Sequence, residues 1–328
     1  MSSVAQPPAA PEAERPTARD IVRRFVEGDL ASLRVVIVLA VIWIIFQSQN
    51  DRFLSAVNLT NLMLQITAVG LISVGVVYVL LLGEIDLSVG AVSGLAAAVV
   101  AVLNVKHGWD PYLAIAAGVA TGTVIGVFHG EISTRFGVPS FVVTLAGLLA
   151  WQGALLYVLG DTGTVNLNDP KITGLANTFY SDSVGWIMAL AAIGAYAGLA
   201  LWGYRQRVAA GLADQALESI IVRIVIVAVA VIAAVAMLNS DRGVPLAPLV
   251  LLAFVAGMQY LATRTKFGRH VYAVGGNAEA ARRAGINVTR IRVTVFAIAG
   301  SMAAIGGIFA ASRPVSYTHL TLPTTPYV

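Results

Sequence analysis

The sequence has no cysteine, and only 12% of its 328 residues are charged. Without cysteine, a disulfide framework, a thiolate metal site and thiol redox chemistry are excluded. The low charge accompanies 58% hydrophobic residues and a mean hydropathy of +0.81, which is more apolar surface than a soluble chain of this length hides. The chain is therefore predicted to lie in a lipid bilayer.

A phosphate-binding loop of the form G-x-x-x-x-G-K-[ST] is also missing. No pattern in the sequence predicts a metal site or another cofactor. Any energy-requiring activity of this chain would therefore draw on a partner protein or on an ion gradient. The net charge of +4 does not predict a nucleic-acid partner, since the basic residues gather on one side of the predicted membrane protein.

Nine segments are long and apolar enough for membrane helices, which need about 20 mainly apolar residues. The predicted fold is therefore all-α, a polytopic membrane helix bundle. The segments lie near 31–47, 59–82, 87–104, 111–129, 138–159, 184–204, 220–238, 244–262 and 293–312. The break at 83–86 has only four residues, so it fits a broken helix as well as a turn in water.

The basic residues predict the orientation. Residues 1–30 are rich in proline, alanine and charge and are predicted to be a disordered cytoplasmic arm, followed by a membrane domain over 31–313. With the N-terminus inside, the inward segments hold fifteen Lys and Arg and the outward ones five, while Arg223 lies within a span near its inner end. This bias predicts a multi-pass membrane protein with a cytoplasmic N-terminus.

The fourth predicted span carries glycines at intervals of four, at Gly118, Gly122, Gly126 and Gly130. Residues at this spacing share one helical face. A stripe of glycine allows two helix backbones to approach closely. Packing inside the chain is the preferred interpretation, and contact with a second copy is the alternative.

The motif "GEIDLSVG" places two carboxylates, Glu84 and Asp86, among apolar and small residues. Residues two apart point in different directions on a helix, and no nucleophile accompanies them, so enzyme chemistry is not expected. We interpret the motif as a structural elbow near the pore, in which Asp86 caps a helix beginning at Leu87 and Glu84 meets a cation or a backbone amide. The two glycines are expected to allow a sharp turn and tight packing. The predicted elbow residues are Gly83, Glu84, Asp86, Ser88 and Gly90.

Polar side chains at membrane depth need a partner or a water-filled path. A possible pathway for a hydroxylated solute therefore includes Asn61, Gln65, Ser73, Thr144 and Gln152. Hydrogen bonds between helices are an equal alternative for these residues. At the inner end of the fourth span, His129 and Glu131 are expected to form an interfacial pair.

The connection over 263–292 is strongly basic, with seven Lys and Arg against one acid, Glu279. Within it, "GGNAEAARRAGI" predicts a short helix with Asn277 as N-cap, Glu279 in the first turn and Gly285 in the left-handed C-terminal position. A helix of about two turns is not stable alone in water. It should therefore pack on its own membrane domain or dock on a partner.

Three motifs resemble a known family. "GEIDLSVG" (83–90), "FGVPSFVVTLAG" (136–147) and "GRHVYAVGGNAEAARRAGINV" (268–288) are similar to the permease subunits of bacterial ATP-binding-cassette importers for monosaccharides, the ribose, xylose and arabinose group. The resemblance covers most of 35–313. "GEIDLSVG" and "WDPYLAI" (109–115) are most similar to xylose-type permeases.

The resemblance implies a transport subunit of the bacterial inner membrane, not an enzyme. Its implied partners are a second copy in a homodimer, a cytosolic ATPase, a periplasmic or lipid-anchored sugar-binding protein and membrane lipid. The family's short basic helix is expected to insert into a cleft of the ATPase, and Arg282 to pair with an acidic group there. Coupling is thus assigned to Gly276, Asn277, Glu279, Ala280, Arg282 and Gly285.

A carrier driven by an ion gradient is the alternative function. Such a carrier would use an intramembrane carboxylate, here Glu84, Asp86 or Glu131, as its coupling site. Dependence of uptake on an added ATPase distinguishes the two functions.

The chain departs from the family after Arg313. Permeases of this family continue through further membrane segments, whereas residues 314–328 read "PVSYTHLTLPTTPYV" and hold no span. This tail is predicted to be non-native or disordered.

Overall fold

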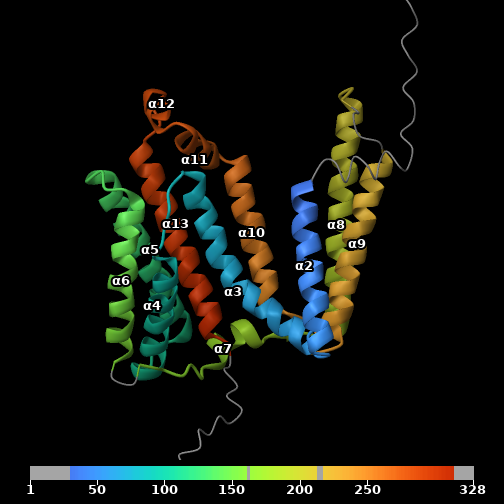
Figure 1. Ribbon diagram of the computed structural model, residues 1–328, viewed down its shortest axis with the longest axis horizontal. Coiled ribbons are helices and arrows are strands. Elements are labelled where there is room, and N and C mark those ends of the chain that lie inside the picture. Colours follow the sequence, from blue (N-terminus) through green and yellow to red (C-terminus); the bar gives the residue numbers. More distant parts are fainter. Residues whose placement is uncertain (1–29, 161–162, 213–216, 314–328) are drawn as a thin grey trace, which may run out of the picture. The chain divides into compact units, whose positions relative to one another are not determined.

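The computed structural model describes residues 30–160, 163–212 and 217–313 (Figure 1). Side chains are described from residue 37 onward in the first helix. The predicted N-terminal arm, apart from its last residue, and the tail at 314–328 lie outside the described residues. The described chain folds into helices, one π-helical turn and two strands of two residues each, which agrees with the predicted all-α fold.

Eight described helices are long and apolar enough to cross a membrane. In order, these are α3 (Ala56–Leu81), α4 (Val89–Ala101) continued by the π-helical turn η1 (Val102–Lys106), α5 (Pro111–Arg135), α6 (Ser140–Leu159), α8 (Asp182–Ala209), α9 (Leu217–Asn239), α10 (Leu246–Arg264) and α13 (Val288–Ala311). The first predicted span corresponds to α2 (Leu30–Gln49), whose fully described part, Ile37–Gln49, is a shorter apolar helix.

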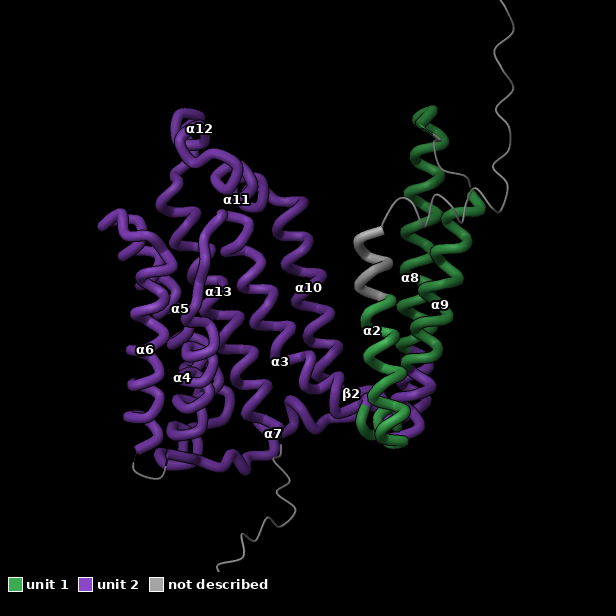
Figure 2. The backbone as a smooth tube through the Cα atoms, viewed as in Figure 1, with its two compact units in different colours: residues 1–58, 188–234 green, residues 59–187, 235–328 purple. Residues whose placement is uncertain are grey.

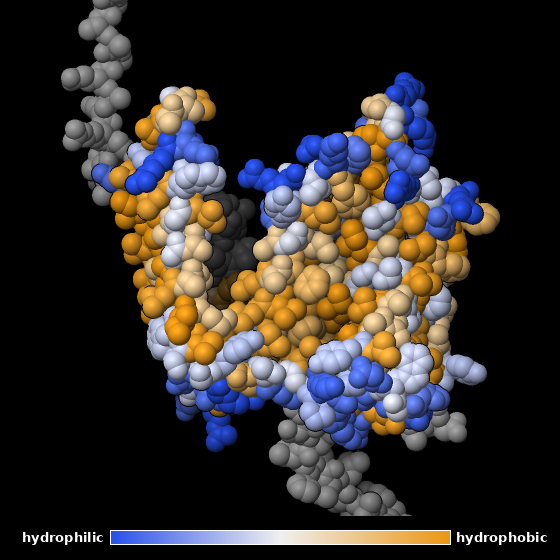
Figure 3. Space-filling model, turned by 180° about the vertical axis from the view of Figure 1, so that it is seen from behind, coloured by the Kyte–Doolittle hydropathy of each residue, from blue (hydrophilic) through white to orange (hydrophobic). Residues whose placement is uncertain are grey.

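The chain divides into two compact units, coloured separately in Figure 2. Unit 1 comprises residues 1–58 and 188–234, and unit 2 comprises 59–187 and 235–328. Figure 3 shows apolar side chains over the middle of the helices and hydrophilic side chains towards their ends, as expected for helices that cross a bilayer.

The core of unit 2 is built around α13, which is the most buried of the candidate spans. It packs along α5 and α4. The predicted glycine stripe of α5 lies in this contact: a Cβ at Gly122 or Gly126 would overlap with carbonyl oxygens of α13, and one at Gly130 would lie 2.7 Å from the Cα of Val293. The stripe is therefore used for packing inside the chain, which was the preferred interpretation.

Short elements close the outer loops of unit 2. Asp110 and Asp169 cap α5 and α7 (Pro170–Asn177) by accepting hydrogen bonds from backbone amides, and each is followed by a proline at the first helical position. The strands β1 (Phe179–Tyr180) and β2 (Val244–Pro245) pair antiparallel. These caps and the strand pair fix the connections between the long helices.

Unit 1 contains α2 and most of α8 and α9. In α2, Phe46 stacks on Phe53 with ring centroids 5.4 Å apart, and Trp43 meets Phe53 edge-on. Gln47 accepts a hydrogen bond from the amide of Leu54, which fixes the turn after the helix. The α8 and α9 helices expose most of their apolar side chains, as helices in contact with lipid do.

Candidate functional site: the coupling loop and the elbow

The basic connection between α10 and α13 is an ordered structure of two helices, α11 (Lys266–Gly276) and α12 (Ala278–Arg283). Three side chains cap its helices in succession. Thr265 accepts from the amide of Gly268, Asn277 from Ala280, and Asn287 from Arg290. We name residues 263–292 the coupling loop, after the role that the resemblance implies for them. Its predicted short helix is confirmed, with Asn277 as N-cap and Gly285 at a φ of +83° after the last turn.

The coupling loop packs directly on the inner end of α3. Apolar side chains of α3, α11, α12 and α13 form one buried cluster, which includes Tyr78, Val79, Leu82, Val271, Val274, Ala281, Val288 and Ile291. Gly275 faces the carbonyl oxygen of Leu81 so closely that a Cβ would overlap with it. The hydroxyl of Tyr78 also donates to the carbonyl of Met258 in α10 at 2.6 Å. The coupling loop is therefore in direct packing contact with the end of α3.

An ion pair joins the coupling loop to the segment after α3. Nη2 of Arg292, in the first turns of α13, lies 3.1 Å from Oε1 of Glu84, and the two side chains are 30% and 15% exposed. Nε of Arg292 is buried without a hydrogen-bond partner among the described residues. Glu84 thus meets a cation, one of the two kinds of partner that the sequence predicted for it.

Residues 82–88 form an extended segment that runs back among the helices before α4 begins (Figure 1). We keep the name elbow for 83–88. Gly83, at a φ of +73°, ends α3. Thr144 accepts a hydrogen bond from the amide of Leu87 at 3.1 Å and donates to the carbonyl of Ile85 at 3.3 Å. The hydroxyl of Ser140 lies 3.4 Å from the amide of Ile85. Two residues of α6 thus hold the backbone of the elbow.

Asp86 stabilises the start of α4, although not in the predicted register. The helix begins at Val89 and not at Leu87. Oδ1 of Asp86 accepts from the amide of Ser88 at 2.8 Å and from its hydroxyl at 2.6 Å. A Cβ at Gly90 would have no neighbouring atom within 4 Å, so the expected tight packing at this glycine is absent.

A buried chain of hydrogen bonds continues from Asp86 to α5 and α6. The hydroxyl of Ser88 lies 3.4 Å from Nδ1 of His129, and Nε1 of Trp151 donates to Nε2 of His129 at 2.9 Å. Because indole nitrogen only donates, Nε2 must accept, and the neutral imidazole then carries its proton on Nδ1 and donates to Ser88. The hydroxyl of Ser88 can then donate to Asp86, so every hydrogen bond from Trp151 to Asp86 has one donor and one acceptor.

The position of His129 corrects the sequence prediction of an interfacial pair with Glu131. His129 is only 2% exposed and faces α4 and α6. Glu131 instead lies 2.6 Å from Arg135 one turn further along α5. Sequence reasoning missed Trp151 and the role of His129, because the partners of His129 come from two other helices, 41 and 22 residues away.

The tip of the coupling loop is exposed and charged. Glu279 lies 2.9 Å from Arg282 and 3.3 Å from Arg283, and all three side chains are more than half exposed. Exposed pairs of this kind contribute little to stability. The arginines are therefore free to exchange their intramolecular partner for an acidic group of another protein.

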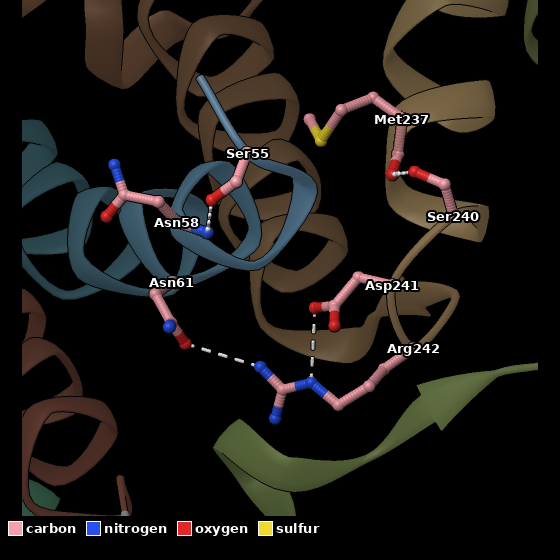
Figure 4. A network of polar contacts seen from close by, with 7 residues as sticks. All are labelled: Ser55, Asn58, Asn61, Met237, Ser240, Asp241 and Arg242. Atoms are coloured by element: carbon pink, nitrogen blue, oxygen red, sulfur yellow. Dashed lines mark hydrogen bonds and ion pairs between the residues drawn. The ribbon is translucent and has the colours of Figure 1, made fainter. Parts of the chain in front are cut away.

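The predicted pathway residues do not share one environment. Asn61, near the outer end of α3, accepts a hydrogen bond from Arg242 at 3.3 Å, and Arg242 also contacts Asp241 (Figure 4). Gln65 and Ser73 lie exposed further along α3.

The remaining two pathway residues lie on α6. Thr144 is fully buried against the elbow, which is the environment of a structural side chain and not of a pathway. Gln152 is exposed. The exposed face of α3 is thus the only part of the described structure that groups two predicted pathway residues, Gln65 and Ser73.

The acidic side chains and histidines of the described residues do not cluster as metal ligands do. Within 30–160, 163–212 and 217–313, no group of three His, Asp or Glu side chains could hold a metal ion. The three carboxylates considered for ion coupling contact other side chains: Glu84 faces Arg292, Asp86 faces Ser88, and Glu131 faces Arg135.

Comparisons with known proteins define the class. The family model described as branched-chain amino acid transport system, permease component, matches residues 58–325. The xylose transport system permease protein of Escherichia coli K12 is 37% identical over 279 residues, which cover 85% of this chain and 71% of the relative. That of Haemophilus influenzae is 36% identical, with 85% and 74% covered, and the ribose import permease protein of Bacillus subtilis is 30% identical, with 88% and 70% covered. No solved structure matches the chain.

The chain is a multi-pass membrane transport subunit and not an enzyme. It belongs to the family of permease components of ATP-binding-cassette importers for branched-chain amino acids and sugars. This family match confirms the resemblance drawn from the three sequence motifs. The family implies an ATPase subunit and a binding protein as partners.

Proposed function

We propose that this chain forms, with a second copy, the pore of an importer that carries xylose or a related monosaccharide across a bacterial inner membrane. A sugar-binding protein outside delivers the cargo, and a separate cytosolic ATPase supplies the energy. The two xylose permeases at 36% and 37% identity support the choice of sugar class. The excess of basic residues in inward segments supports a cytoplasmic N-terminus and coupling loop.

One observation carries the proposal: a continuous set of contacts runs from the exposed α12 to the elbow. Ala281 of α12 packs in the same buried cluster as Leu82, and Arg292 of the coupling loop pairs with Glu84. We infer that α12 and the residues beside it bind the ATPase, through Gly276, Asn277, Glu279, Ala280, Arg282 and Gly285. Closure of the ATPase would then push the end of α3 and, through Glu84, the elbow.

Reconstitution tests this function. The permease is placed in proteoliposomes with its ATPase and binding protein, and uptake of radiolabelled xylose, ribose and arabinose is measured with and without ATP. We expect uptake only with ATP and the ATPase, and we expect the variant R282E/R283E to lose it, because two cations at the docking tip become anions. The variant E131Q is the control, since Glu131 contacts only its own helix end.

The opposite result would favour a carrier driven by an ion gradient. Uphill uptake without the ATPase, abolished by collapse of the ion gradient and by E131Q, would contradict the proposed function. Equal uptake of the three sugars would leave the importer in place and contradict only the choice of xylose.

A further inference from the structure

Arg223 is a charged residue inside the most apolar of the candidate spans, and neither the coupling loop nor the elbow uses it. It is the seventh residue of α9, about 10 Å along the helix from its first residue. A charged side chain at this depth is costly unless it has a partner or reaches the interface, and it marks a functional site by default. The surroundings of Arg223 in unit 1 therefore need an explanation.

A cavity of about 220 Å³ lies between α8 and α9, entirely within unit 1. Arg207 faces it from the last turn of α8 and Arg223 from α9. Its other lining residues are aromatic or apolar and include Tyr196, Leu199, Tyr204 and Ile220. Its α8 side reaches from Tyr196 to Arg207, about 16 Å along the helix. The cavity therefore has an apolar and aromatic stretch along α8 that extends away from Arg207.

Two guanidinium groups at one cavity repel each other unless an anion lies between them. In the described part of the chain, the ion pairs involve other arginines, and none includes Arg207 or Arg223. Guanidinium groups bind phosphate with paired, charge-assisted hydrogen bonds. Apart from the two arginines, the lining is apolar or aromatic, which suits a hydrocarbon chain.

We propose that this cavity binds an anionic phospholipid of the inner leaflet. Its phosphate lies between Arg207 and Arg223, and an acyl chain follows Leu199 and Tyr196 along α8. Basic pockets between membrane helices on the cytoplasmic side bind anionic headgroups in this way. Arg205 and Arg207 belong to the basic residues whose excess predicts the cytoplasmic side, which is the side of that leaflet. The proposal does not depend on the identity of the sugar or on the ATPase.

Thermal unfolding of the purified full-length chain in a neutral detergent tests the proposal. We expect phosphatidylglycerol to raise Tm, and phosphatidylcholine at the same concentration to have no comparable effect, because a ligand that binds only the folded state stabilises it. R207Q and R223Q should each raise the phosphatidylglycerol concentration for half-maximal stabilisation about tenfold, the effect of one lost charge-assisted contact. R205Q is the matched control, since Arg205 is exposed on the same helix but does not line the cavity.

Native mass spectrometry of the folded fraction supplies a second readout if a variant is poorly stable. Wild type and R205Q should retain one phosphatidylglycerol more than R223Q does. Three results would overturn the proposal: equal stabilisation by phosphatidylcholine, an equal response of R205Q and R223Q, or the same stabilisation by inorganic phosphate at the same concentration. The last result would identify a site for soluble anions.

Discussion

Removal of either charge of the Glu84–Arg292 pair should uncouple the ATPase from transport. The two charged atoms lie 3.1 Å apart, with Glu84 15% and Arg292 30% exposed. At an effective dielectric constant of about 20, unit charges about 4 Å apart attract by about 4 kcal/mol, whereas fully exposed pairs measure about 0.2 to 1 kcal/mol. Because Glu84 is mostly buried and Arg292 is partly exposed, we take an intermediate coupling energy of about 1 to 2 kcal/mol, which corresponds to a factor of about 5 to 30 in an equilibrium constant.

A double-mutant cycle measures this energy directly. E84Q, R292Q and E84Q/R292Q are compared in reconstituted vesicles by the rate of ATP-dependent sugar uptake and by the ATPase rate that the permease stimulates. Each single change should leave one charge without its partner and lower uptake by about tenfold. The double variant should be less impaired than the product of the two single effects, because it contains no unpaired charge.

The geometry also predicts the result of a conservative change. Only one nitrogen of Arg292 contacts Glu84, and Nε has no partner among the described residues. A lysine, which supplies a single charged donor, should therefore retain most of the coupling, although arginine and lysine are not interchangeable at bidentate sites. Two results would refute the proposed link. One is an R292K variant that is as inactive as R292Q, and the other is a double variant whose loss of uptake equals the product of the two single losses.

Three further changes test other parts of the structure. D86A leaves the amide and hydroxyl of Ser88 without their acceptor, which should destabilise the folded subunit by about 1 to 2 kcal/mol and lower assembly or transport. The preferred sugar should stay the same, and competition between sugars in the uptake assay would reveal a change. G126A should reduce folded protein in size-exclusion chromatography, because its Cβ would overlap with a backbone carbonyl of α13, whereas G90A should behave as wild type since a Cβ there has no neighbour within 4 Å. W151F should lower Tm by leaving Nε2 of His129 without its donor, and unchanged thermal unfolding would show that the chain of hydrogen bonds contributes nothing.

Much of the fold was predictable because membrane helices are specified by their own composition. The spans, the glycine stripe and the caps of the coupling loop depend on residues close together in the sequence, and these local rules hold at Asn277 and Gly285 as predicted. The start of α4 was misplaced by two residues, because Thr144 of another helix keeps the backbone extended through Leu87. A contact with a residue 57 positions away cannot be read from the local pattern.

The polar residues in the spans were the least predictable part of the site. Helical spacing alone does not reveal which face of a helix meets another helix, so Thr144 was grouped with Gln65 and Ser73 although it lies buried. Hydrogen-bonding chemistry offered one signal that was not used: His129 and Trp151 both need partners at membrane depth, and each can satisfy the other. The pairing of Glu84 with a cation was expected from its depth, while the identity of Arg292 needed the three-dimensional packing of the coupling loop.

The two ends of the elbow are held by different kinds of interaction, and this difference determines which end can move. At the deep end, hydrogen bonds join Asp86, Ser88 and His129. Ser88 and His129 are buried and Asp86 is partly exposed, so water competes little for the contact between Ser88 and His129. At the inner rim, Glu84 and Arg292 remain partly exposed, so water and salt weaken their attraction. Between the two ends, the backbone at Ile85 is bonded to Ser140 and Thr144 of α6. Gly83, which precedes Glu84, adopts a φ of +73° with no atom within 4 Å of a Cβ position. A force applied to the coupling loop should therefore turn the rim end about Gly83, while α4 keeps its attachment to α5 and α6.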